Sequence, residues 1–130
     1  MTKKLLRLFA LLFWYLALTF VVQLYGYSQH NPAIESTIRG SRYAWDYEAM
    51  YAALNLVWGI YCWKASKQPE QHALFIEFTI AANIFHPIVM TTIGFFRSGE
   101  FYHLLIDSLV LLVPALLLLH ARATEQKLKN

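Results

Sequence analysis

The stretch ALFIEFTIAANIFHPIVMTTIGFF, residues 73–96, decides the fold of this chain. It contains no lysine, arginine or aspartate, and a helix of about 20 apolar residues crosses roughly 30 Å of hydrocarbon. Within it Thr79, Asn83, His86 and Met90 recur at intervals of four, three and four. These intervals place the four side chains on one face of a helix. The stretch therefore predicts a membrane helix with one polar face.

The composition of the whole chain agrees with a membrane protein. Its 130 residues are 58% hydrophobic and only 15% charged, whereas soluble domains contain about 25% charged residues. A soluble domain of this size would expose large apolar patches. The apolar stretches that predict membrane spans are residues 5–25, 46–64, 73–96 and 101–121. We therefore predict an all-α fold, an antiparallel four-helix bundle that forms one transmembrane domain over residues 1–130.

The basic residues report the orientation of the spans. The two ends of the chain and the loop between the second and third spans carry Lys3, Lys4, Arg7, Lys64, Lys67, Arg122, Lys127 and Lys129. The other two loops carry Arg39, Arg42 and Arg97. By the positive-inside rule, both termini are predicted to be cytoplasmic. We expect a multi-pass protein of the inner (cytoplasmic) membrane.

The same charges bear on the partners of the protein. The formal net charge is +3, but the basic residues are spread over the span ends and form no patch for nucleic acid. The expected partner is the lipid bilayer, together with further copies of the chain or a larger membrane complex. A single cysteine, Cys62, excludes an internal disulfide.

Polar side chains gather in the outer half of the predicted bundle. Counted from residue 96 at the outer edge, His86 lies about 15 Å inside and Met90 about 9 Å inside. The fourth span starts at the same edge, so His103 lies about 3 Å and Asp107 about 9 Å below it. An ionisable group in a membrane costs several kcal/mol unless it meets a partner or water. We therefore expect these groups to face the bundle interior.

The second span adds polar groups at the same depth. Glu48 and Asn55 share one face of that helix, with Asn55 about 14 Å from the outer edge. We predict a polar pocket that opens outward. Its predicted lining residues are Glu48, Asn55, Asn83, His86, Met90, His103 and Asp107.

His103 and Asp107 are the candidates for chemistry. Their spacing allows a carboxylate–imidazole contact within one helix, which would raise the basicity of the histidine and hold one tautomer. With His86 and Glu48 they would supply two nitrogens and two carboxylates, a set that suits zinc or non-haem iron or manganese. The cofactor stays unknown, and these residues leave a divalent metal open alongside a proton relay. The other interpretation is that the polar groups only pack the helices together.

Part of the chain resembles a bacterial family of small four-span integral membrane proteins that is carried as a domain of unknown function. The resembling residues are Pro69-x-x-His72, Phe78-Thr79-Ile80-x-x-Asn83-x-x-His86 with Met90, and His103-x-x-x-Asp107. They lie within residues 51–114, about half of the chain. The resemblance implies the four-helix architecture and no known activity.

These observations favour one function and leave two others open. The pocket predicts that the protein binds or carries a small ligand, a lipid headgroup or a cation. The first alternative is a membrane enzyme that acts on a lipid-soluble substrate with the His103–Asp107 acid–base pair or a metal. The second is an accessory subunit of a larger membrane complex. The sequence has no catalytic or cofactor motif, which favours a protein that is not an enzyme.

Overall fold

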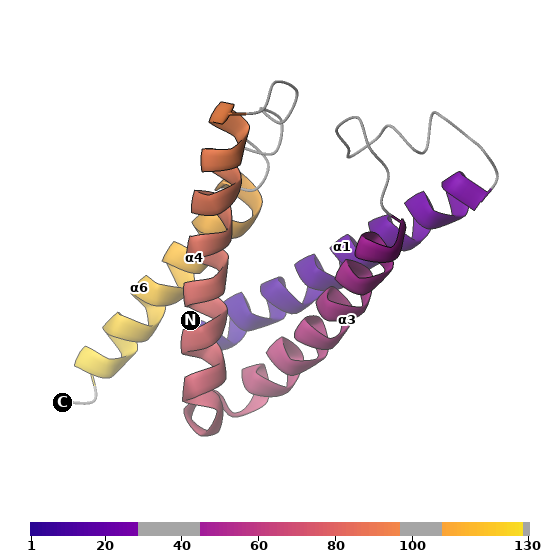
Figure 1. The fold of residues 1–130 in the computed structure, drawn as a ribbon. Coiled ribbons are helices and arrows are strands. Elements are labelled where there is room, and N and C mark those ends of the chain that lie inside the picture. The colour runs from indigo at the N-terminus through magenta and orange to yellow at the C-terminus, as the bar shows by residue number, and fades with distance from the viewer. Residues whose placement is uncertain (29–44, 97–107, 129–130) are drawn as a thin grey trace. The chain divides into compact units, whose positions relative to one another are not determined.

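The computed structural model describes residues 1–28, 45–96 and 108–128, and within these ranges every regular element is helical (Figure 1). This confirms the all-α prediction for the described part of the chain. The elements are α1 (Thr2–Ser28), α3 (Trp45–Lys67), the 3₁₀ turn η1 (Pro69–His72), α4 (Ala73–Phe96), the π-helical turn η2 (Ser108–Leu112) and α6 (Val113–Lys127).

The helix boundaries agree with the predicted spans in part. α4 covers the same residues, 73–96, as the predicted third span. α6 continues to Lys127, beyond the predicted end at residue 121, whereas residues 101–107 lie outside the described part of the chain. α1 begins at Thr2, three positions before the predicted start at Leu5. The α1 extension contains two lysines, and the α6 extension contains arginine, glutamate, glutamine and lysine. These residues favour helices but are too polar to count toward a span.

Three helical stretches are long and apolar enough to cross a membrane. They are Thr2–Gln23, Pro69–Phe96 and Leu109–Lys127. α3 coincides with the predicted second span, but it does not reach the same apolarity, because it contains Asp46, Glu48, Asn55 and Lys64. The structure therefore supports a membrane protein. Hydropathy alone does not decide whether α3 also crosses the membrane.

The first of two compact units consists of Phe9–Tyr61 and holds most of α1 and α3; we call it the α1–α3 unit. Phe13 stacks on Trp58 with ring centroids 5.0 Å apart, and Phe20 meets Tyr51 edge-on at 5.4 Å. The first pair joins the earlier part of α1 to the later part of α3, and the second joins the later part of α1 to the earlier part of α3. The two helices are therefore antiparallel, as predicted for sequential neighbours.

The second unit, which we call the α4–α6 unit, consists of Met1–Leu8 and Cys62–Asn130. In it α4 packs along η2 and α6, which run in the opposite direction (Figure 1). The buried residues of α4 form one stripe at helical spacing: Ile76, Thr79, Ile80, Asn83 and Pro87. Those of α6 are Ala115, Leu118, Ala121 and Arg122. The two alanines let the backbones approach closely, which is how membrane helices gain packing energy.

The π-helical turn η2 immediately precedes a proline. Pro114 is the second residue of α6 and has no N–H to offer the carbonyl of Val110. A π-helix uses bonds from residue i to i+5 instead of i+4, so it bypasses the residue that lacks the donor. We attribute the change of winding over Ser108–Leu112 to this proline. π-helical turns of this kind occur often at functional sites.

Candidate functional site

The predicted pocket residues divide into those that the structure describes and those that it does not. His103 and Asp107 lie outside the described residues, and Glu48 lies in α3 but its side chain is not described. Asn55 belongs to the α1–α3 unit. The residues that the α4–α6 unit brings onto one helix are Asn83, His86 and Met90, together with Thr79.

The predicted polar face of α4 changes its surroundings along its length. Thr79 and Asn83 are buried, with 0% and 3% of their surfaces exposed. His86 and Met90, one and two turns nearer the end of α4, are half-buried. The face is therefore enclosed at its beginning and more accessible at its end. Asn83 lies at the transition between the two parts.

Asn83 offers two oxygen acceptors at one position. Its side-chain Nδ2 donates to the backbone carbonyl of Thr79 at 2.8 Å, so the side-chain oxygen takes no part in that bond. Its backbone carbonyl would normally accept from the N–H of the residue four positions later, but that residue is Pro87, which has none. A buried acceptor without a donor costs about 1–3 kcal/mol. A bound cation or hydrogen-bond donor would remove this penalty.

Asn55 in α3 makes the same type of bond in its own helix. Its Nδ2 donates to the carbonyl of Tyr51 at 2.8 Å, and 5% of its surface is exposed. No proline follows it four positions later, where the chain has Gly59. Asn55 therefore repeats the side-chain arrangement of Asn83 but not the freed backbone carbonyl.

Thr79 has a structural role that the sequence did not predict. Its side chain lies within hydrogen-bonding reach of the thiol of Cys62, in the last part of α3. Both residues are fully buried, and both belong to the α4–α6 unit. The contact fixes the end of α3 against the first half of α4. Thr79 is therefore better explained by packing than by ligand binding.

The Cys62–Thr79 contact predicts low thiol reactivity. Because Cys62 is the only cysteine and is fully buried, it should react with N-ethylmaleimide slowly in the folded, detergent-solubilised protein and quickly in SDS. Thr79→Val removes the hydroxyl at nearly constant shape and should lower the free energy of unfolding by about 1 kcal/mol. That loss corresponds to labelling about five times faster through opening of the structure.

Intact-mass spectrometry over a time course measures this rate. Thr92→Val is the matched control, since the Thr92 hydroxyl bonds to the carbonyl of Ile88 on the exposed side of the same helix. Rapid labelling of the folded wild-type protein would contradict the buried position of Cys62.

The metal hypothesis rests on residues that the structure does not describe. Within residues 1–28, 45–96 and 108–128, no three or more histidine, cysteine, aspartate or glutamate side chains group so as to hold a metal ion. The predicted set was His86, His103, Asp107 and Glu48, of which only the His86 side chain is described. A metal at these four residues thus stays a prediction.

A second polar region lies at one end of the α4–α6 unit, and the sequence did not predict it as a site. The Glu125 carboxylate near the end of α6 accepts hydrogen bonds from the Met1 ammonium at 2.7 Å and from the backbone N–H of Thr2 at 3.0 Å. Nearby, Nη1 of the buried Arg122 lies 3.9 Å from the carboxylate of Glu70 in η1. These contacts join residues more than 50 positions apart, and no local sequence pattern signals them.

The fold and the site define a class: a small helical protein with three helices able to cross a membrane and a buried polar face on one of them. The chain belongs to the family described as "Family of unknown function (DUF6632)", which matches residues 3–128. No curated protein and no solved structure matches the chain significantly.

The family match is wider than the resemblance found in the sequence. That resemblance was limited to residues 51–114, but the match also includes the first helix and the segment that follows it. The absence of a known activity agrees with what the resemblance implied. The bacterial origin and the four spans of the family stay predictions.

Proposed function

We propose that the protein is a multi-pass protein of the cytoplasmic membrane, with α3 as the fourth span and both termini in the cytoplasm. Its 23 residues give α3 a length of roughly 34 Å at about 1.5 Å per residue, enough to cross the hydrocarbon. The basic residues support the orientation, because eight of the eleven lie near the chain ends and in the last turn of α3. Termini on the same side require an even number of spans.

In this arrangement the protein binds a small ligand at a polar intramembrane site around Asn83 and His86. Acceptor oxygens dominate the described part of this site, which selects for a small cation or for the ammonium group of a lipid headgroup. His103 and Asp107 are the proposed proton-accepting and anionic groups that complete it. A carboxylate at that depth would add to the selection for positive charge.

One observation supports this proposal: Asn83 is buried in an apolar helix, its side-chain oxygen takes no part in the bond to Thr79, and Pro87 removes the usual N–H donor to its backbone carbonyl. A residue that only packed two helices together would not need the following Pro87, which removes one helix hydrogen bond. Broken helical bonding that exposes carbonyls to a bound ion is a recurrent device of ion sites in membrane proteins.

Thermal unfolding of the detergent-purified protein tests the site. Sodium, potassium, ammonium and ethanolamine chlorides are compared with choline chloride at constant ionic strength, choline being too bulky for such a site. A cation that binds should raise the thermal midpoint as its concentration rises. The free energy of unfolding should increase by about 2.7 kcal/mol at one hundred times the dissociation constant. This stabilisation should disappear in Asn83→Ala and decrease in Pro87→Ala, which restores the backbone donor.

Thr92→Ala is the control, because it removes a side chain bonded to a backbone carbonyl on the exposed side of α4. It should keep the full response. The proposal fails if none of the four cations stabilises the wild-type protein beyond choline, or if Asn83→Ala responds as the wild type does.

A further inference from the structure

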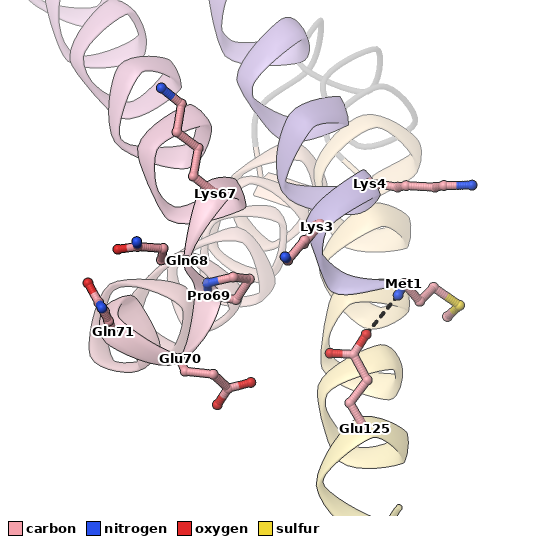
Figure 2. A pocket seen from close by; sticks show the side chains of 9 residues that line it. All are labelled: Met1, Lys3, Lys4, Lys67, Gln68, Pro69, Glu70, Gln71 and Glu125. Carbon is pink, nitrogen blue, oxygen red and sulfur yellow. Dashed lines mark hydrogen bonds and ion pairs between the residues drawn. The ribbon is translucent and has the colours of Figure 1, made fainter.

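The polar end of the α4–α6 unit contains a hollow that is open to solvent. Its volume is about 660 Å³, and its charged and amide lining includes Lys3, Lys4, Lys67, Gln68, Glu70 and Glu125 (Figure 2). The lining comes from the start of α1, the end of α3, η1 and α6. Segments far apart in the sequence therefore contribute positive charge to one place.

The two carboxylates of the hollow already have cationic partners. Glu125 binds the Met1 ammonium and the Thr2 N–H, and Figure 2 shows the first of these contacts. Glu70 lies 3.9 Å from Nη1 of Arg122. Arg122 is 7% exposed, so its charge is held in place beside Glu70. The acidic residues thus serve the structure and do little to neutralise the lysines.

The three lysines are exposed, and within residues 1–28, 45–96 and 108–128 none has a salt-bridge partner. In Figure 2 the Lys3 ammonium points toward Pro69, whereas the Lys67 side chain extends away from Pro69 and Glu70. Flexible lysine stems let the ammonium groups turn toward a bound anion. The amides of Gln68 and Gln71 also line the hollow and add hydrogen-bond donors.

The position of the hollow along the helices indicates the source of the anion. Two stretches able to cross a membrane begin at its edge, at Thr2 and at Pro69. One or two turns along the chain, the Arg7 guanidinium lies 5.7 Å from the ring centre of Trp63. Tryptophan and arginine of this kind favour the level of the lipid headgroups. The hollow therefore lies at the level where phospholipid phosphates are found.

We propose that this hollow binds the phosphate of an anionic phospholipid headgroup, with Lys3 and Lys67 as its main electrostatic contacts. Juxtamembrane lysines attract anionic lipids in this way. The site is separate from the proposed cation site around Asn83, and its test does not depend on that site.

Native mass spectrometry of the detergent-solubilised protein, titrated with dioleoyl phosphatidylglycerol or dioleoyl phosphatidylcholine, tests the proposal. Phosphatidylglycerol should bind in preference to phosphatidylcholine. The double variant K3Q/K67Q should bind phosphatidylglycerol about 30-fold more weakly, since each juxtamembrane lysine contributes about 1 kcal/mol, a factor of about five. The matched control K64Q/K127Q loses the same charge from two lysines that do not line the hollow and should bind as the wild type does.

Two soluble probes separate the sources of the phosphate. Inorganic phosphate and glycerol 3-phosphate at millimolar concentration should not displace the lipid; displacement would assign the hollow to a free phosphate and overturn the lipid proposal. An equal loss in both double variants would show a diffuse surface charge, and the absence of a preference over phosphatidylcholine would show no site; either result overturns it. Thermal midpoints measured without lipid verify that both variants are folded.

Discussion

Replacing Gly59 with alanine is expected to weaken the packing of α1 against α3, although alanine is the better helix former. A Cβ atom at this position would lie 2.5 Å from Cδ1 of Trp14 and 3.0 Å from the backbone oxygen of Ala10. The indole is bulky and the carbonyl belongs to a helix, so neither moves away freely. Overpacking of this kind costs about 1–3 kcal/mol, which exceeds the gain of up to about 1 kcal/mol in helix propensity. Gly59→Val should have the larger effect.

The free energy of unfolding, measured by SDS titration of the detergent-solubilised protein, gives the size of this effect. The double variant G59A/W14L is the decisive companion, because leucine vacates the space that the new methyl group needs. Adding Gly59→Ala to the Trp14→Leu protein should therefore cost less stability than adding it to the wild type. A Gly59→Ala protein as stable as the wild type would contradict the close approach of α1 and α3.

Leu118→Ala is expected to destabilise the α4–α6 unit by about 2–5 kcal/mol. Leu118 is fully buried in α6, whereas its neighbour Leu117 is 47% exposed. In a membrane, lipid solvates an apolar side chain as well as protein does. The loss therefore comes from the cavity and the missing dispersion contacts, and it should lie near the lower end of this range.

Leu117→Ala is the matched control, one position away in the same helix, and should cost less than about 1 kcal/mol, since an exposed leucine leaves no cavity. SDS unfolding of the two variants side by side checks the difference. Equal losses would show that α6 presents another face to α4 than the structure gives.

The sequence predicted the helices better than their ends. α4 was found with its boundaries because Pro69 and Arg97 flank a nearly unbroken apolar run. The polar ends of α1 and α6 were missed, since hydropathy does not detect a helix that leaves the apolar phase. The helix α3 was predicted correctly, and its crossing of the membrane stays a proposal because Asn55 and four charged residues reduce its hydropathy.

The candidate site was visible in the sequence only where it depends on one helix. The polar face of α4 follows from intervals of three and four residues, so its period identifies it. The contact of Thr79 with Cys62 and the freed carbonyl of Asn83 became apparent with the structure, although Pro87 was a signal for the second. The basic hollow depends on a contact between Glu125 and Thr2, 123 positions apart, and periodicity carries no information about such a contact.

The winding of η2 affects how its own residues must be placed on a helical wheel. An α-helix advances by about 100° per residue, and a π turn accommodates one residue more than an α turn does. A wheel drawn from α6 and continued backward into Ser108–Leu112 therefore loses phase within that turn. Mutational scans of Ser108–Leu112 should consequently take their own angular origin, because a period fitted to α6 would assign these side chains to the wrong azimuth.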